Sequence, residues 1–327
     1  MNAVDLFPIL AGALGIAVFI LGLLVWSWPK HRDAFPVALM ACMFLGCAVA
    51  VHTWRNLQRV GQHLGALVAR SDMLWSLKAD ETIRNLMAQP KYQEAGKLNR
   101  FEAKVYSQGG EDGIIAEIFR RIGVTNRVFC EFGSSDGVEN NTVTLLLLGW
   151  SGVWLDGDEA AVERARRRFS DRIAAGRLSV YREFITAEKI ESLFSKVKLP
   201  EEFDLLSIDI DRNDYYVWER ITHYRPRVVV IEYEGMFAPG MDWVVPYAAD
   251  AVHDGTSRTG ASLSALERLA RGKGYSLVGC SLTGVNAFFV RDDLTGSKFA
   301  KPFTAENHWE PPRYHLIYHL PGHPRNP

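Results

Sequence analysis

From Tyr106 onwards, short runs of β-branched and aromatic residues alternate with longer helical stretches. This alternation predicts a parallel sheet whose strands are joined by crossover helices. The expected strands are 127–133, 152–156, 178–183, 203–210, 227–233, 275–280 and 286–291. Only the short segment 281–285 separates the last two, so they must pair antiparallel, because a parallel pair needs a longer crossover. We therefore expect a Rossmann-like α/β domain with a seven-stranded, mostly parallel sheet.

Two apolar runs precede this domain. Residues 6–28 carry no charged side chain, and as a helix they would be roughly 34 Å long, enough to cross a hydrocarbon core. Residues 35–54 form a second run in which His52 is the only ionisable group. A cleaved signal peptide fits less well, because no Lys or Arg precedes the first run. The sequence predicts a transmembrane helical hairpin over residues 1–54, in contact with the lipid bilayer through both runs.

Residues 55–105 are expected to form a helix and a linker that lead to the domain at 106–294; residues 295–327 form a tail containing Pro and His. Within 57–74, apolar residues recur at spacings of three and four, as in a heptad repeat. The stripe consists of Leu57, Val60, Leu64, Leu67, Ser71 and Leu74. It indicates either a stalk that forms a homodimer or a helix that packs on its own domain or on the membrane.

Charge and cysteine usage exclude some classes of protein. The chain has 37 Lys and Arg against 38 Asp and Glu, a net charge of -1. It lacks the surplus of cations that a general nucleic-acid binder uses to neutralise phosphates, so no nucleic-acid partner is expected. The four cysteines do not have zinc-ligand spacing. We expect reduced thiols and no metal held by them.

The first expected strand ends in an acidic residue followed by a glycine-containing turn. Glycines at such a turn let the backbone bend sharply and lie against a ligand, which a Cβ would obstruct. The residues predicted to contact a cofactor here are Glu131, Gly133, Ser134, Asp136 and Gly137.

The next two strands also end in residues suited to a nucleoside. Asp156 lies about twenty residues beyond the glycine turn, the spacing at which an acid hydrogen-bonds the ribose hydroxyls. Asp158 is expected to cap the helix that follows. Glu183 and Phe184 close the third strand, where we expect them to line an adenine; a core position is the alternative for Phe184.

Polar side chains gather after the fourth and fifth strands. Asp209, Asp211, Asn213 and Asp214 follow the fourth, and Glu232 and Glu234 end the fifth. Open α/β sheets bind ligands at the carboxyl ends of their strands. Asp214 is expected to cap a helix, whereas Asp209 and Asp211 are predicted to serve the site.

Four stretches, at 106–113, 131–141, 150–158 and 207–216, resemble the FkbM-type methyltransferase group, in particular bacterial relatives of it. The resemblance covers about 106–294 and implies a class I methyltransferase fold with S-adenosylmethionine as the cofactor. It also implies that Gln108 and Asp209 contact this cofactor. The acceptor would be a hydroxyl oxygen of a sugar, glycan or other small molecule.

Removal of the hydroxyl proton needs a nearby base. Asp209, Asp211 and His253 are the expected catalytic residues. Because S-adenosylmethionine is a cytosolic metabolite, we expect a two-pass protein of the bacterial inner membrane with a cytoplasmic catalytic domain. The sequence departs from the pattern of this methyltransferase group at two positions, with Arg212 in place of Gly and Glu234 in place of Asn. A membrane-anchored binding protein without catalytic activity is therefore an alternative function.

Two further alternatives involve a metal. Asp209-Ile210-Asp211 is formally a D-x-D motif, which in membrane-bound glycosyltransferases holds a divalent ion against a sugar diphosphate. A metal-dependent O-methyltransferase would use Asp209, Asp211 and Glu232. The glycine turn and Asp156 favour the methyl donor over a nucleotide sugar.

Overall fold

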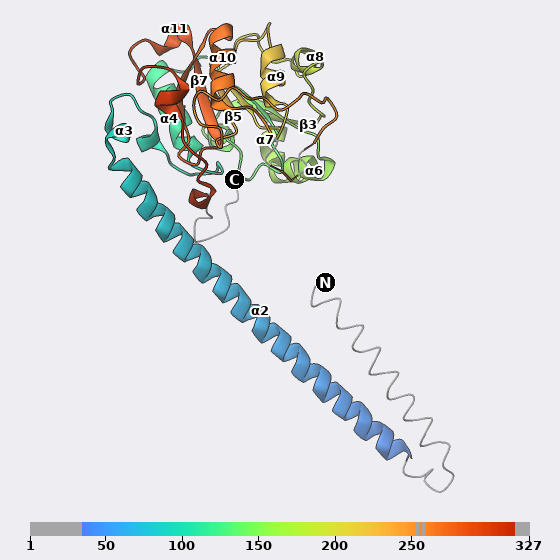
Figure 1. Cartoon of the computed structure of the whole chain (residues 1–327). Helices are drawn as coiled ribbons and strands as arrows, with labels where there is room; N and C mark the ends of the chain where they lie inside the picture. The colour runs from blue at the N-terminus through green and yellow to red at the C-terminus, as the bar shows by residue number, and fades with distance from the viewer. Residues whose placement is uncertain (1–34, 253–254, 257–258, 318–327) are drawn as a thin grey trace. The chain divides into compact units, whose positions relative to one another are not determined.

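The computed structural model describes residues 35–252, 255–256 and 259–317. The chain divides into two compact units, Met1–Leu74 and Trp75–Pro327. In the first unit the described part belongs to α2 (Phe35–Met87), a helix that runs on without a break into the second (Figure 1). None of the described helices combines the length and the apolar character that a membrane crossing requires. The predicted hairpin is therefore not supported: 35–54 is not a separate helix, and 6–28 lies outside the described residues.

A seven-stranded sheet lies at the centre of the second unit, in the order β3-β2-β1-β4-β5-β7-β6. Its strands are β1 (Val128–Phe132), β2 (Ser151–Asp156), β3 (Leu178–Arg182), β4 (Leu205–Ile208), β5 (Val228–Glu232), β6 (Tyr275–Cys280) and β7 (Asn286–Arg291). β1 to β5 pair in parallel, whereas β7 lies antiparallel to both β5 and β6. The predicted mixed sheet with an antiparallel last pair is confirmed.

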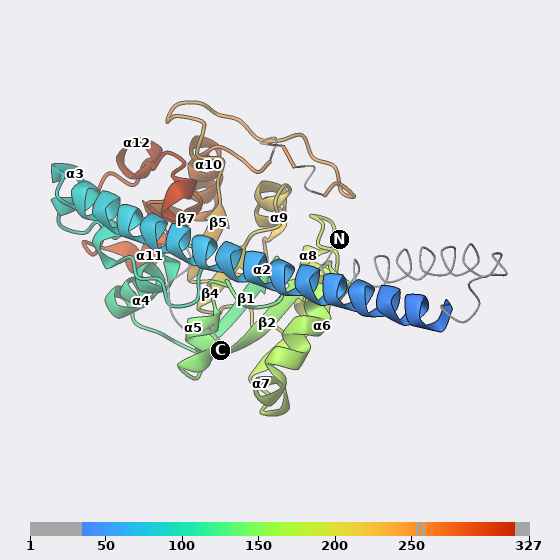
Figure 2. The same ribbon diagram turned by 90° about the horizontal axis from the view of Figure 1, so that it is seen from below.

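Helices cover both faces of the sheet, because consecutive residues of a buried strand point to opposite sides. Phe129 packs in one apolar cluster with α4 (Glu111–Ile122), α5 (Val143–Leu147) and α6 (Glu159–Arg168). Its neighbour Cys130 packs in the other, with α8 (Ile190–Lys196), α9 (Asp214–Arg220) and α10 (Leu263–Lys273). Figure 2 shows α9 and α10 on one side of the sheet and α5 and α6 on the other.

The helix predicted over 159–174 is broken in two. α6 ends at Arg168, and α7 (Ser170–Ala174) begins after the single residue Phe169. The Phe169 ring is buried and lies edge-on to Trp154, with the ring centroids 4.7 Å apart. The helix breaks at this residue because its ring packs against the sheet.

The described C-terminal residues pack on the same unit. They contain α11 (Asp292–Thr295), α12 (Ala305–His308) and η3 (Tyr314–Leu316). Glu310 is fully buried and accepts hydrogen bonds from Lys91 and Tyr92, both in α3 (Pro90–Gln93), and from Arg313. Lys97, which lies just before η2 (Asn99–Phe101), donates to the carbonyl of Asn307. These hydrogen bonds join the described C-terminal residues to the segment after α2.

Candidate active site

The parallel strands β1 to β5 bring their carboxyl ends to one edge of the sheet. The glycine turn after β1 is fixed there by close backbone contact. Gly133 has φ +66°, and a Cβ at this position would lie 1.6 Å from the carbonyl oxygen of Asp209. Only glycine fits, both for its φ and for this contact. The turn after β1 and the loop after β4 are therefore in contact.

Asp156, at the end of β2, is bound to the same turn. One of its carboxylate oxygens accepts from the Ser135 amide at 2.7 Å, and the other accepts from the Asp158 amide at 2.8 Å. The side chain is only partly buried, so its oxygens keep acceptor capacity toward a ligand. Asp158 caps α6 by accepting from the amides of Ala160 and Ala161, which confirms the predicted cap.

Phe184 lies beside Gly157, the residue that follows Asp156. Its side chain is 44% exposed, and its Cδ2 lies 3.4 Å from the position that a Cβ of Gly157 would take. The prediction placed Phe184 over an adenine or in the core, and the exposed ring is not a core residue. Glu183 forms an ion pair with Lys196 of α8. An aromatic surface next to a carboxylate suits a nucleoside base and its ribose.

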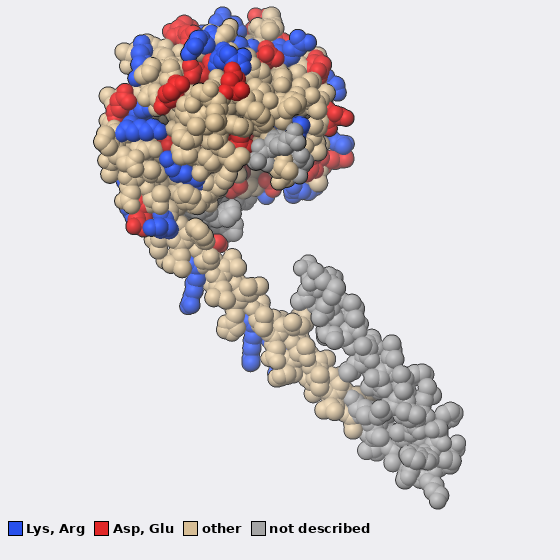
Figure 3. Space-filling model, viewed as in Figure 1, with Lys and Arg blue, Asp and Glu red and all other residues tan. Residues whose placement is uncertain are grey.

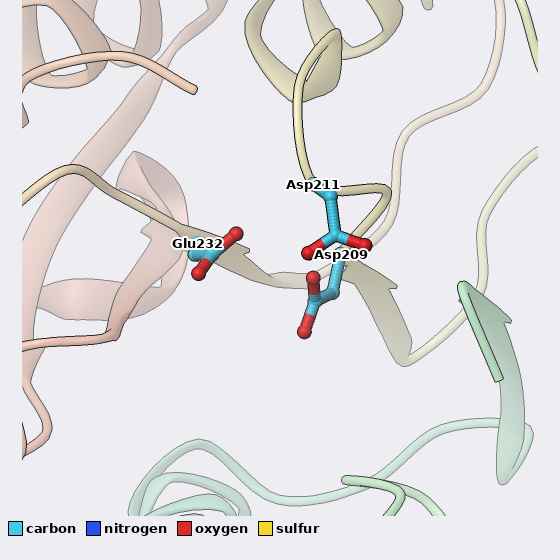
Figure 4. A group of neighbouring side chains, drawn as sticks. All are labelled: Asp209, Asp211 and Glu232. Atoms are coloured by element: carbon cyan, nitrogen blue, oxygen red, sulfur yellow. The ribbon is translucent and has the colours of Figure 1, made fainter. Parts of the chain in front are cut away.

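Asp209, Asp211 and Glu232 form an acidic cluster where β4 and β5 end (Figure 4). Each offers one carboxylate oxygen, and these oxygens all lie within 4.8 Å of one another. Asp211 is exposed and has φ +63°, a left-handed conformation that Asp tolerates better than most residues. Oxygens at this spacing can hold a divalent cation, share protons, or take a proton from a hydroxyl group.

The surroundings of the cluster disfavour its negative charge. Burial raises the pKa of Asp209 well above its usual range, and the neighbouring carboxylates of Asp214 and Asp211 raise it further. The pKa of Glu232 is raised in the same way, first by burial and then by Asp209. Like charges at this separation repel each other, so the cluster binds protons or cations more readily than an isolated carboxylate.

Glu131 is a buried acid on β1, next to the glycine turn. It is buried, and its oxygens accept from the Asn141 amide and from the Thr142 hydroxyl. Burial raises the pKa of Glu131 to about 7. Asn141 also donates to the hydroxyl of Ser207 on β4. The carboxyl group of Glu131 therefore orders the segment before α5.

The other predicted cofactor residues have different surroundings. Ser134 is fully buried, and its hydroxyl has no hydrogen-bond partner within the described ranges. Asp136 forms ion pairs with Arg168 at 3.2 Å and Arg164 at 3.7 Å, both on α6. Gln108 is exposed, and its carbonyl accepts from Lys104. His253 lies outside the described residues.

The prediction that Asp214 caps a helix needs a correction. Asp214 is the first residue of α9, and the residue in the cap position is Asn213. One oxygen of Asp214 accepts from the Ile210 amide at 2.8 Å, so its side chain holds the loop that carries Asp211. Arg212 lies in that loop, and its buried Nε has no hydrogen-bond partner in the described part of the chain.

Sequence reasoning missed two acids that hold the loop 105–110, Glu111 and Asp112 at the start of α4. One oxygen of Asp112 accepts from the amides of Val105, Tyr106 and Ser107. Glu111 accepts from the amides of Gly109 and Gly110, and from the side chain of Asn286 on β7. Acids in the first turn of a helix after a polar, Gly-containing segment are the sequence signal for such loop anchors.

The strand order and the antiparallel β7 are typical of the Rossmann-like fold of class I methyltransferases. The site lies at the carboxyl edge, where this class of fold binds its ligands. No protein-family model matches the chain, and neither does any curated protein.

Several solved structures are similar. A putative O-methyltransferase from Klebsiella pneumoniae matches with 16% identity and a TM-score of 0.38, over 68% of this chain and 99% of that one. The methyltransferase domain of bacterial CtHen1-C matches with 16% identity and a TM-score of 0.37, over 56% and 97%. The O-methyltransferase NcsB1, in complex with S-adenosylmethionine, matches with 18% identity and a TM-score of 0.32, over 55% and 52%. TM-scores this low assign neither a fold nor an activity, so the assignment of a Rossmann-like fold rests on the strand order.

Proposed function

We propose that this protein transfers the methyl group of S-adenosylmethionine to a hydroxyl oxygen of a small molecule or glycan. The observation that carries the proposal is the hydrogen bond from Ser135 to Asp156. It joins a glycine turn to an acid at the adjacent strand end, and this combination supports a nucleoside site. The buried, unpartnered hydroxyl of Ser134 and the exposed ring of Phe184 fit the same ligand.

Different residues along the carboxyl edge of the sheet would bind the cofactor and the acceptor. Asp156 would hold the ribose and Phe184 would cover the adenine. When bound, S-adenosylmethionine supplies an electrophilic methyl group. The carboxylate of Asp211 would accept the proton of the acceptor hydroxyl, because it is exposed and adjoins Asp209. Positioning of the hydroxyl by this cluster would supply most of the remaining effect.

A metal-assisted form of the same reaction is the second candidate. It is favoured by the carboxylate oxygens of Asp209, Asp211 and Glu232, which lie within 4.8 Å of one another. Such a cation would orient and acidify the acceptor hydroxyl. Methyl transfer that is lost in a chelator and restored by Mg²⁺ or Mn²⁺ supports this form, and transfer unaffected by a chelator contradicts it.

The test of the main proposal is transfer of a radiolabelled methyl group from S-adenosylmethionine to small-molecule and glycolipid extracts. We expect labelled product with the wild-type chain and at least tenfold less with Asp156→Ala. Cofactor binding without transfer to any fraction would instead support the inactive binding protein that Arg212 and Glu234 leave open.

We also propose that the chain is attached to a bacterial inner membrane, with its α/β domain in the cytoplasm. The uncharged run 6–28 supports attachment, and the free thiols of Cys130 and Cys280 suit a reducing compartment. Fractionation should place the full chain in the carbonate-resistant membrane fraction, and a chain lacking 6–28 should leave it. Recovery of the full chain in the soluble fraction would refute the attachment.

A further inference from the structure

An apolar stripe on α2 is left uncovered. Val60, Leu64, Leu67 and Leu74 are 60–67% exposed, and Leu57 is 37% exposed. Their spacing puts them at the a and d positions of a heptad, so they lie along one side of the helix.

Apart from Arg70 at position g, the charges of the same segment lie away from the stripe. With Leu57 at position a, Arg55 and Arg59 fall at the outer positions f and c. No charged residue occupies an a, d or e position between 57 and 75. In Figure 3, most of the α2 surface in view is likewise uncharged. A second identical helix can therefore approach without bringing like charges together.

We propose that a second copy of this chain covers the stripe, forming a parallel two-stranded coiled coil through residues 57–74. In parallel register each g position faces the next e position of the other helix. Arg70 would then lie beside Trp75 of the partner subunit, a cation against an aromatic ring. Trp75 is 55% exposed and free to form this contact.

The buried area is sufficient for a stable pair. Leu57, Val60, Leu64, Leu67 and Leu74, with the flanking Val68 and Trp75, give seven apolar side chains on each helix. At roughly 80 Å² for each side chain, the two helices together would bury about 1,100 Å². Stable, specific interfaces begin at about 1,000 Å².

Cysteine crosslinking of the full chain tests the pairing. Leu67→Cys places a thiol at a d position, and Ala66→Cys places one at the adjacent outward c position, both with Cys42 and Cys47 replaced by Ser. Under mild oxidation we expect a disulfide-linked dimer, of twice the 36.8 kDa chain mass, with Leu67→Cys and at least fivefold less with Ala66→Cys. Equal yields, or no dimer with either variant, would overturn the proposal.

Light scattering on the purified full chain gives an independent readout. The wild type and Ala66→Glu should be dimers, and Leu64→Glu should be a monomer that still binds S-adenosylhomocysteine, which shows that its α/β domain is folded. A wild-type monomer that binds lipid vesicles and loses this binding with Leu64→Glu would mean that the stripe lies on a membrane surface.

Discussion

The Ser135 amide donates to the carboxylate of Asp156 at 2.7 Å, and this hydrogen bond joins the turn after β1 to the end of β2. The second oxygen of Asp156 accepts from the Asp158 amide. The acid is therefore held in one orientation before any ligand arrives. Such preorganisation lowers the cost of binding, because the side chain has little freedom left to lose.

Replacing Asp156 should weaken cofactor binding specifically. Asp156→Ala removes charge-assisted hydrogen bonds worth about 1.5–3 kcal/mol, so we expect the Kd for S-adenosylhomocysteine to rise by about ten- to a hundredfold. Asp158→Ala is the control: it removes the cap of α6 and should cost about 1 kcal/mol of stability while the Kd stays within threefold. Titration calorimetry measures the Kd, and equal losses in both variants would contradict the assigned role.

Gly133 should tolerate no side chain. Gly133→Ala places a Cβ 1.6 Å from the Asp209 carbonyl oxygen, so the β1 turn or the β4 loop must move. Gly176→Ala is a matched control, because Gly176 also has a positive φ, +69°, with nothing within 4 Å of an added Cβ. The control should cost about 1–2 kcal/mol from its φ alone.

Thermal unfolding and cofactor titration distinguish the two glycine variants. Gly133→Ala should lose S-adenosylhomocysteine binding and have the lower Tm of the two. A Gly133→Ala chain that binds as tightly as the wild type would show that this close contact is not needed for the site.

Features of the fold that depend on neighbouring residues can be predicted from the sequence, whereas features that depend on tertiary packing cannot. The strands follow from local alternation, the antiparallel last pair follows from its short connection, and the cap at Asp158 follows from its own position. The break at Phe169 does not, because it depends on tertiary packing against Trp154. The contact of Asp214 with the Ile210 amide spans only four residues, but the local sequence does not distinguish it from a helix cap. The buried setting of Glu131 depends on Thr142, which the fold brings to it.

Asp211 is predicted to act in the reaction and not in binding. Asp211→Asn should lower the rate of methyl transfer about a hundredfold, the usual contribution of a general base. The Kd for S-adenosylhomocysteine should change less than threefold. Asp171→Asn, on exposed α7, makes the same chemical change outside the site and should alter neither value. Radiolabelled transfer under single-turnover conditions measures the rate; full activity in Asp211→Asn would assign the base elsewhere.

Stability should fall as the pH rises from 6.5 to 8. The pKa of Glu131 is raised to about 7, and those of Asp209 and Glu232 are raised well above their usual range. A carboxyl whose pKa is higher in the folded chain stabilises it at low pH, and this contribution is lost as the pH passes the folded value. Glu131 alone should lose about 1 kcal/mol over this window, a Tm decrease of a few degrees.

Two other groups have smaller effects in this test. The pKa of buried His308 is lowered to about 3, so keeping it neutral costs free energy mainly below its usual pKa, and only the onset of this cost falls at the acid end of the window. The pKa of Glu117 is lowered to about 2 by Arg120 and Arg121, and its contribution is constant above pH 6. Glu232→Gln should flatten the decrease in Tm. A Tm that rises between pH 6.5 and 8 would contradict the raised pKa values.

Calorimetric titration of the wild-type chain, first in the presence of a chelator and then with Mn²⁺ in place of it, tests the central claim most directly. The account predicts that S-adenosylhomocysteine binds in a one-to-one ratio without any metal, and that a uridine diphosphate sugar does not bind. Binding of the nucleotide sugar that requires Mn²⁺, with no binding of S-adenosylhomocysteine, would contradict the account and assign Asp209 and Asp211 to a glycosyltransferase.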